Sequence, residues 1–544
     1  MRLNKILAGL FSLGLILCPL TVSADETIVA QSQDGIQTYT DIASAWSAAQ
    51  DGTTIVMMDD WILSDRLIVD EGKSVYLEMN GHKIDRNLNA EDKSDGEVIY
   101  LSKDSTLTLT SDSDATFNFK GYNATSTYTN VSLESGGLVT GGASSNGGGG
   151  IHMKKGSTLN LSHVAVAGNK CNSESSSNGG GIDISDDNCT LNMVGSTISY
   201  NGSRYAGGIG IYGSHALINM ESSSIDYNFA DQDGGGIYYT AIDGSINMAK
   251  NSKMNGNHAG EIGGAIRFRN SDCQLVSSDA SAEISYNSCS NSEYGGGAIY
   301  LTGLSSGDDP TIDGITFDSN TTTKDNGGAI YVSQKHTTIK NCVFKNNTAK
   351  SGGAICLMAS YTTVSNCTFQ GNSASKYGGA IYDGYDDNTI DSCVMTDNKA
   401  EVEGGAIYVN QNDDITLSGT LMIQDNHRGG NYDDDLFLQK TFFATAYVKG
   451  EVTSDSRVGI RTADNGETQI GTDIKSDCSK SFFLNDSGQY HVSYESGTLY
   501  KRSGTLLGSI FGNANLGIAI LVMGGIVIIG AACLVIHKKK TVNN

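Results

Sequence analysis

The sequence is dominated by a repeat in which a Gly-Gly-Ala-Ile element alternates with an apolar-x-x-Asn element. In its most regular stretch, residues 327–409, the motif isoleucines Ile330, Ile355, Ile381 and Ile407 fall 25, 26 and 26 residues apart. Each unit holds only short runs of alternating apolar residues, none long enough for a helix. A fixed period of this length predicts stacked coils of β-strands, because one coil buries its apolar face only against the next copy.

The repeat suggests a structural role for three kinds of residue. The glycine pair lies at a bend, where a left-handed φ or a close backbone approach excludes a Cβ. The isoleucine points inward, and the asparagine is expected to hydrogen-bond to its copy in the next coil, forming an Asn ladder. In the regular block these residues are Gly328, Ile330, Asn347, Gly353, Ile355, Asn372, Gly379, Ile381 and Asn398. We therefore predict an all-β fold, a right-handed single-stranded parallel β-helix (solenoid).

The alternation of GGAI with FxxN resembles the repeats of chlamydial polymorphic outer membrane proteins and other bacterial β-helix surface proteins of the pectin-lyase-like superfamily. Strict FxxN motifs begin at Phe317, Phe344 and Phe369. The resemblance covers about residues 145–430 and implies a β-helix displayed at a bacterial cell surface. It fails at the C-terminus, because those proteins end in an outer-membrane barrel and this sequence does not.

Both ends of the chain resemble targeting segments. Residues 1–24 have the basic start, apolar centre and small-residue cleavage site of a signal peptide. Leu516–Ile536 is a stretch of 21 residues without a charge, which is enough for one transmembrane helix. The lysines that follow predict a cytoplasmic tail over residues 537–544. We expect a single-pass protein of the cell membrane, with its large N-terminal domain extracellular.

Between these ends the sequence predicts three regions. Residues 25–52 form an N-terminal segment in which Thr40–Gln50 is a short helix that caps the open end of the solenoid. Residues 53–470 form the parallel β-helix, with regular repeats over 145–430. Residues 471–515 form a C-terminal cap and membrane-proximal stalk, in which 482–500 is a candidate hairpin.

The charge of the chain narrows the choice of partners. The formal net charge of the 544 residues is −24. The sequence has only two prolines, which agrees with continuous strand pairing, because proline cannot donate a backbone hydrogen bond. Without the signal peptide and tail, 31 basic residues remain against 60 acidic ones, a net charge of −29 outside the membrane. This charge argues against nucleic acid and anionic polysaccharide as partners. The expected partner is a protein or glycan on a host or neighbouring cell, besides the membrane itself.

Nine of the eleven cysteines lie outside the signal peptide and the apolar segment, so they cannot all pair within one chain. Cys342, Cys367 and Cys393 occupy the same point in three consecutive units. Two interpretations are open: a ladder of disulfides or metal ligands, or a column of small apolar residues that faces inward.

A search for catalytic residues finds acidic pairs only. Asp386 and Asp387 are the candidates, since glycosidases and lyases use carboxylates held on adjacent coils. The His-Gly and Arg-x-Lys companions of polygalacturonases are absent, and the nine histidines show no metal-ligand spacing. We expect no cofactor or metal, although the Asp-rich loops are candidates for weak Ca²⁺ binding.

Tyrosine follows the motif isoleucine in several units, at Tyr238, Tyr300, Tyr331, Tyr382 and Tyr408. Because successive side chains of a strand alternate, these tyrosines are expected to point outward as an exposed column. Such a column can hold sugar rings or a partner protein. The alternative is ordinary stacking between coils, which stabilises the sheet.

These patterns favour a non-catalytic, membrane-anchored adhesin or ligand-binding surface protein. The regular repeat supports this function, because catalytic β-helices usually interrupt the repeat with long loops over a cleft. The alternatives are a carbohydrate-active enzyme of the pectin-lyase-like class, acting as a polysaccharide lyase or glycoside hydrolase, and a structural envelope spacer.

Overall fold

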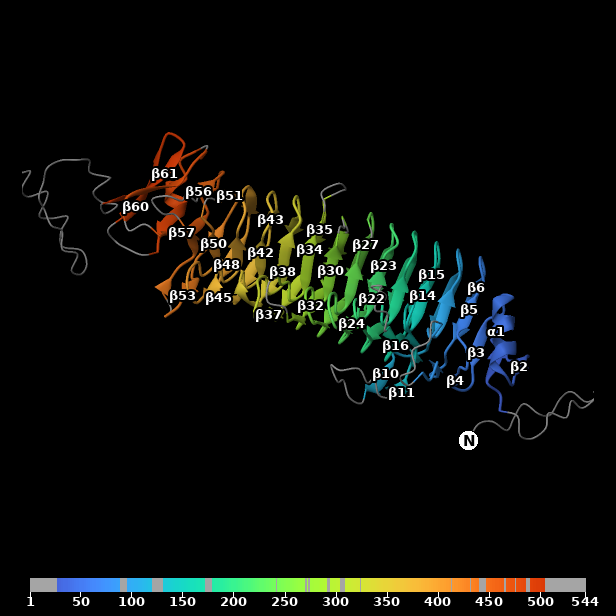
Figure 1. Cartoon of the computed structure of the whole chain (residues 1–544). Coiled ribbons are helices and arrows are strands. Elements are labelled where there is room, and N and C mark those ends of the chain that lie inside the picture. The colour runs from blue at the N-terminus through green and yellow to red at the C-terminus, as the bar shows by residue number, and fades with distance from the viewer. Residues whose placement is uncertain are drawn as a thin grey trace, which may run out of the picture.

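The computed structural model describes residues 27–503 apart from 89–94, 120–130, 172–178, 241, 270, 271, 273, 291–293, 304–308, 323, 412, 431, 440–446, 464–465, 475 and 486–489. The described chain is an elongated rod of stacked coils that follows the sequence from one end to the other (Figure 1). Its strands pair almost throughout in parallel with the corresponding strands of the neighbouring coil. The predicted all-β parallel solenoid is therefore confirmed.

Each regular coil contains four short strands, and the forty strands from β14 to β53 make ten such coils. The first strands begin at the motif isoleucine: β14 Ile151–Met153, β18 Ile182–Ile184, β22 Ile209–Ile211, β26 Ile237–Tyr239, β30 Ile266–Arg269, β34 Ile299–Thr302, β38 Ile330–Ser333, β42 Ile355–Leu357, β46 Ile381–Asp383 and β50 Ile407–Val409. The second strands are β15 Thr158–Ser162, β19 Thr190–Val194, β23 Leu217–Glu221, β27 Ser245–Ala249, β31 Gln274–Ser277, β35 Thr311–Asp313, β39 Thr338–Lys340, β43 Thr363–Ser365, β47 Asn388–Asp391 and β51 Asp414–Ser418.

The third strands precede the ladder asparagine: β16 Val164–Ala167, β20 Thr197–Ser199, β24 Ser224–Asp226, β28 Lys253–Asn255, β32 Glu283–Ser285, β36 Thr316–Asp318, β40 Val343–Lys345, β44 Thr368–Gln370, β48 Val394–Thr396 and β52 Met422–Ile423. The fourth strands follow that asparagine: β17 Lys170–Cys171, β21 Gly202–Ser203, β25 Phe229–Ala230, β29 His258–Ala259, β33 Ser288–Cys289, β37 Thr321–Thr322, β41 Thr348–Ser351, β45 Ser373–Tyr377, β49 Lys399–Ala400 and β53 His427–Arg428. In the stack, each residue lies beside its counterpart, as Ile330 does beside Ile355.

The predicted Asn ladder runs without interruption through all ten coils. In a representative rung, Asn347 donates from its backbone nitrogen and from Nδ2 to Oδ1 of Asn372, at 3.0 and 2.9 Å. At the C-terminal end, Asn426 donates in the same way to the buried carboxylate of Asp435, at 3.0 and 2.8 Å. The ladder satisfies buried backbone donors at each sharp turn, which is why an amide side chain recurs there.

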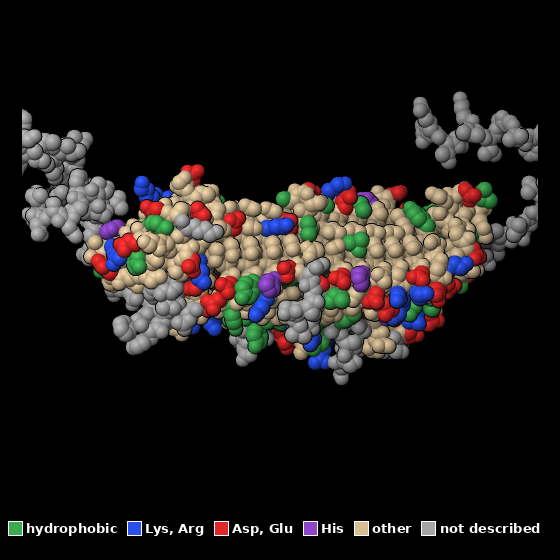
Figure 2. Space-filling model, turned by 90° about the horizontal axis from the view of Figure 1, so that it is seen from above, with side chains coloured by type: hydrophobic (Ala, Val, Ile, Leu, Met, Phe, Trp, Pro, Cys, Tyr) green, Lys and Arg blue, Asp and Glu red, His purple; other side chains and the backbone are tan. Residues whose placement is uncertain are grey.

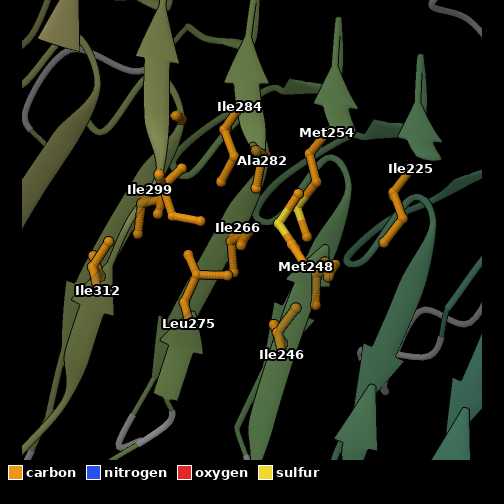
Figure 3. Packing of buried hydrophobic residues seen from close by; sticks show 14 of the residues in the cluster. Ile225, Ile246, Met248, Met254, Ile266, Leu275, Ala282, Ile284, Ile299 and Ile312 are labelled. Atoms are coloured by element: carbon orange, nitrogen blue, oxygen red, sulfur yellow. The ribbon is translucent and has the colours of Figure 1, made fainter. Parts of the chain in front are cut away.

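The interior of the rod is a continuous apolar column. Figure 3 shows how residues of successive coils stack on their counterparts, for example Ile246, Leu275 and Ile312. Phe317, Phe344 and Phe369 stack with ring centroids 5.0 and 4.7 Å apart. The core thus consists of side-chain rows at the strand spacing rather than of a globular cluster.

No disulfide forms among the cysteines of the described chain. Cys342, Cys367 and Cys393 are at most 1% exposed and belong to the inner core. The interpretation as an inward-facing column of small apolar residues is confirmed, and no disulfide or metal ladder forms among the described cysteines.

A helix covers the N-terminal end of the rod, as predicted. Helix α1 (Ile42–Gln50) begins after Asp41, whose carboxylate accepts a hydrogen bond from the backbone nitrogen of Ser44 at 2.8 Å. Trp46 is buried and meets Trp61 edge to face, with ring centroids 6.4 Å apart. The helix packs on β3 (Ile55–Met57) and β6 (Ser74–Glu78), so it closes the open core.

Further strands close the C-terminal end of the rod. These are β55 (Leu436–Leu438), β57 (Arg457–Thr462), β59 (Phe482–Leu484) and the predicted hairpin, formed by β60 (Tyr490–Glu495) and β61 (Thr498–Ser503). Within the described ranges, α1 is the only α-helix, and none is long and apolar enough to cross a membrane. The predicted signal peptide, residues 1–24, and the predicted span Leu516–Ile536 lie outside the described residues.

One face of the rod has a largely uncharged centre (Figure 2). Figure 2 shows a face whose centre consists of regular rows without charged side chains, with Asp, Glu, Lys and Arg gathered towards its borders. Part of the surface carries a further asparagine row, in which Asn192 donates to Asn160 and Asn219 donates to Asn192, both at 2.8 Å. Charges are therefore concentrated at turns and at a few interruptions of the rows.

Candidate functional site

The tyrosines after the motif isoleucine point away from the inner core, but they are not exposed. Tyr300, Tyr331 and Tyr408 are 5, 5 and 3% exposed, and Tyr382 is partly buried. Tyr300 and Tyr331 stack with ring centroids 4.9 Å apart, and Tyr382 and Tyr408 with centroids 5.4 Å apart. The expected exposed column is therefore wrong, while the expected stacking between coils is present.

Residues just before the glycine pairs cover this column. Tyr294 lies edge-on against Tyr300 and Tyr331, with centroids 6.2 and 6.3 Å away, and Tyr377 lies 4.5 Å from Tyr408. Burial raises the pKa of the Tyr300 hydroxyl to about 12, so this group stays protonated at neutral pH. Ligand binding by Tyr300, Tyr331, Tyr382 and Tyr408 remains a prediction without an exposed face to support it.

Asp386 and Asp387 lie in an exposed turn between β46 and β47. Asp386 accepts a hydrogen bond from the backbone nitrogen of Asp414 at 3.0 Å, so two acidic turns stack on each other. The nearby Lys449 is ion-paired with Asp414 at 2.8 Å. This is the geometry of a solvated turn, and catalysis by Asp386 and Asp387 stays a prediction.

The structure also assembles a charged cluster, which the sequence analysis missed. In the first coils, the outward position after the isoleucine holds Tyr100, His152 and Asp183, which lie side by side in register. His152 Nε2 lies 3.6 Å from Asp183 Oδ2 and 3.0 Å from Ser185 Oγ. Tyr100 packs on His152, with ring centroids 5.2 Å apart. The sequence does carry a sign of this cluster: at the position after the motif isoleucine, His152 and Asp183 stand where later coils have tyrosine.

Two cations and two further carboxylates complete this cluster. Arg66 lies over the Tyr100 ring at 4.7 Å and pairs with the buried Glu97. Lys154 donates to Ser185 Oγ at 3.1 Å and pairs with Asp186 at 2.9 Å. Arg66 also lines a groove of about 590 Å³ between α1 and strands β4 (Trp61–Ile62) and β5 (Leu67–Val69).

In this cluster the carboxyl group of Asp183 has a higher pKa than the imidazole of His152, the reverse of their usual order. Asp183 is 1% exposed, neither of its carboxylate oxygens has a hydrogen-bond partner in the described chain, and burial raises its pKa to about 7. Burial lowers the pKa of His152 to about 4. At neutral pH a largely uncharged imidazole thus lies beside a partly protonated carboxyl group, an arrangement suited to proton transfer.

A glycine run permits this close packing. A Cβ at Gly147 would lie 2.4 Å from His152 Nδ1, and one at Gly148 would lie 2.8 Å from the backbone nitrogen of Asp183. Within the described ranges, no group of three or more His, Cys, Asp or Glu side chains is arranged to hold a metal ion. The predicted weak Ca²⁺ binding stays untested by this geometry.

Residues 273–436 match the protein family described as "Right handed beta helix region". No curated protein and no solved structure matches the chain. Together with the parallel coils, the family match supports the predicted right-handed β-helix. The resemblance to polymorphic outer membrane proteins and to the pectin-lyase-like superfamily remains a prediction.

Proposed function

We propose that this chain is a membrane-anchored extracellular β-helix, which acts as a non-catalytic adhesin or ligand-binding surface protein. The observation that carries this proposal is the unbroken Asn ladder from Asn169 to Asn426, closed by Asp435. Such a ladder ties the coils into one stiff unit, and ten coils at about 4.8 Å give a rod on the order of 50 Å. A stiff rod presents a long surface whose groups keep fixed positions relative to one another.

The anchoring part of the proposal rests on the signal-like residues 1–24 and the apolar segment Leu516–Ile536. Deleting residues 516–544 should release the protein into the medium, whereas the full chain should remain at the cell surface and be cleaved there by added protease. Retention of the truncated chain on cells would contradict this mode of anchoring.

The binding part is tested by adhesion. Cells that display the full chain are compared with cells that display none, on host cells, matrix proteins and a glycan panel. Selective attachment supports the proposal. Equal attachment of both cell types contradicts it and favours a structural envelope spacer.

The second candidate function is a carbohydrate-active enzyme, and the cluster around His152 and Asp183 favours it. A polysaccharide panel is incubated with the protein, and new reducing ends and unsaturated products are measured. Cleavage that is lost in Asp183→Asn would establish an enzyme at this cluster. Cleavage that is lost in Asp386→Ala would instead support the turn predicted from the sequence.

A further inference from the structure

A second column of tyrosines lies on the edge of the rod beside the Asn ladder. The residue before each ladder asparagine has a left-handed backbone, with φ between 53 and 69°. Glycine, asparagine and aspartate adopt this conformation most readily, and they occupy most of these positions. Tyrosine takes the position in three coils, at Tyr200, Tyr227 and Tyr286. A bulky residue in this conformation is uncommon and is a reason to look for function.

These tyrosines form an aromatic ridge, which we define as Phe117, Tyr200, Tyr227 and Tyr286. Tyr200 and Tyr227 stack with ring centroids 5.3 Å apart and planes 11° apart, and Phe117 meets Tyr200 edge-on at 6.1 Å. Phe117 belongs to the hairpin of β10 (Thr116–Phe119) and β11 (Val131–Ser135), which lies beside the rod near β16 (Figure 1). Tyr227 and Tyr286 are 52 and 67% exposed. The ridge is thus open to solvent, unlike the covered column.

Gly256 leaves room for the Tyr227 ring in the next coil. It occupies the coil between Tyr227 and Tyr286, and a Cβ there would lie 2.5 Å from Tyr227 Cε1. The backbone nitrogens of Tyr227, Gly256 and Tyr286 donate to the next coil at 2.9, 3.0 and 3.1 Å, so the coils stay in register. The backbones of Tyr227 and Tyr286 are two strand spacings apart, about 9.6 Å. Gly256 itself therefore adds no side chain to the ring, and Tyr227 remains 52% exposed.

Polar groups border the ridge on both sides. On one side, Asn255 Oδ1 accepts a hydrogen bond from Ser285 Oγ at 2.5 Å, while its Nδ2 has no partner in the described chain. On the other side, His258 Nδ1 lies 2.8 Å from Ser288 Oγ, and its Nε2 lies 3.4 Å from the exposed Ser290 Oγ. A pyranose has apolar faces and a rim of hydroxyl groups, so it matches an aromatic face flanked by amide, imidazole and hydroxyl groups.

Acidic groups near the ridge favour an uncharged sugar over an anionic one. Asp226 lies in β24 next to Asn255 in β28 and accepts a hydrogen bond from its backbone nitrogen at 2.9 Å. The chain as a whole carries −24. Acidic surroundings repel uronic acids and sulfated sugars, so an uncharged glycan fits this edge better than an anionic one.

We propose that Tyr227 and Tyr286 form a binding site for a neutral glycan, whose sugar rings stack on the tyrosine faces while Asn255 and His258 contact its hydroxyl groups. This proposal rests on the proposed function as a ligand-binding surface protein and names its site and ligand class. The site lies on a different edge of the coil from the tyrosines that follow the motif isoleucine.

Binding is measured by calorimetry with the full chain and with uncharged oligosaccharides of glucose, mannose, galactose and N-acetylglucosamine; oligogalacturonate is the anionic comparison. We expect at least one neutral oligosaccharide to bind, and Tyr227→Asn or Tyr286→Asn to weaken it by about tenfold or more. Asparagine suits the left-handed turn, as Asn346 does at φ 53°, so these variants are expected to fold. The matched control is Tyr361→Asn, because Tyr361 is 47% exposed with φ 65° but lies at another turn.

A third variant tests the position of the Tyr227 ring. Gly256→Asn keeps the left-handed backbone but places a side chain against the Tyr227 ring, so binding should weaken by a similar factor. Equal affinity in the wild type and in Tyr227→Asn would overturn the site. So would an absence of binding to every neutral oligosaccharide, or binding of an aromatic peptide at this edge in their place.

Adhesion of cells displaying the same variants separates the two proposals. Adhesion without oligosaccharide binding would leave the surface function standing and overturn the glycan site. Oligosaccharide binding that Tyr227→Asn weakens, without adhesion, would support the site and contradict the adhesin function.

Discussion

Replacing Asn347 by alanine tests the Asn ladder in the middle of the rod. Asn347 is fully buried, and its Oδ1 accepts hydrogen bonds from the backbone nitrogen and from Nδ2 of Asn320, both at 3.0 Å. Its own Nδ2 donates to Phe317 O at 3.0 Å and to Asn372 Oδ1 at 2.9 Å. One side chain therefore serves two neighbouring coils.

The cost follows from the groups that lose a partner. In Asn347→Ala the buried backbone N–H of Asn320 loses the acceptor that the ladder supplies, and Asn320 Nδ2 keeps only its bond to Ile284 O at 2.8 Å. Phe317 O loses one donor as well. At about 1–3 kcal/mol for each buried group left unsatisfied, the free energy of unfolding should fall by about 3–5 kcal/mol.

Urea unfolding measures this change, and hydrogen exchange at the Asn320 amide shows whether the opening is local, since long repeat arrays need not unfold as one unit. Asn346→Gly is the control: Asn346 is the exposed, left-handed neighbour, and glycine fits its φ of 53°, so the change should stay within about 0.5 kcal/mol. The double variant Asn347→Ala/Asn372→Ala should cost less than the sum of the two, because their mutual bond is lost once.

A loss below about 1 kcal/mol in Asn347→Ala, or a loss equal to that of the Asn346→Gly control, would refute the reasoning. The ladder would then be a consequence of coil stacking rather than a source of stability.

Four further predictions concern buried groups. Tyr331→Ser should lower the free energy of unfolding by about 2–4 kcal/mol, measured by thermal unfolding, without affecting oligosaccharide binding. Asp183→Asn should stabilise the protein at pH 8 but not at pH 4. The carboxyl group of Asp183 loses its proton at about pH 3.8 in the unfolded chain but keeps it up to about pH 7 in the folded protein. The folded state of the wild type therefore loses stability as the pH rises between these values, in total by up to about 4 kcal/mol. Thiol labelling should reach the eight described cysteines only after denaturation, since none forms a disulfide and all are buried; labelling of Cys367 in the native protein would contradict this. Gly353→Ala should destabilise by about 2–3 kcal/mol in urea unfolding, because its Cβ would lie 2.1 Å from Gly379 O.

The solenoid, its ladder and its capping helix were predictable because they depend on local spacing. A period of 25 or 26 residues places Ile355 beside Ile330 in the next coil, and Asn372 then lies within hydrogen-bond distance of Asn347. Helix α1 follows from its own cap and apolar face, which need no distant partner. The stacked strands and the Asn ladder repeat the same interactions from coil to coil along one axis.

The exposure of the tyrosines was not predictable, because it depends on residues outside the strand pattern. The alternation of side chains along the strand correctly predicts that Tyr331 points away from the core, but the loop residue Tyr294 covers it. Tyr227 faces solvent because its left-handed backbone carries the ring beyond the turn. Two tyrosine columns of one solenoid thus differ in accessibility.

The sequence by itself determined the period, and with it the parallel register, the inward rows and the ladder, since each of these follows from identical units stacked in order. Only the tertiary structure decided which outward positions are open and which polar groups meet. His152 and Asp183 are 31 residues apart and become neighbours through the register of β14 and β18. Their shifted pKa values arise mainly from burial, which the spacing of the repeat does not reveal.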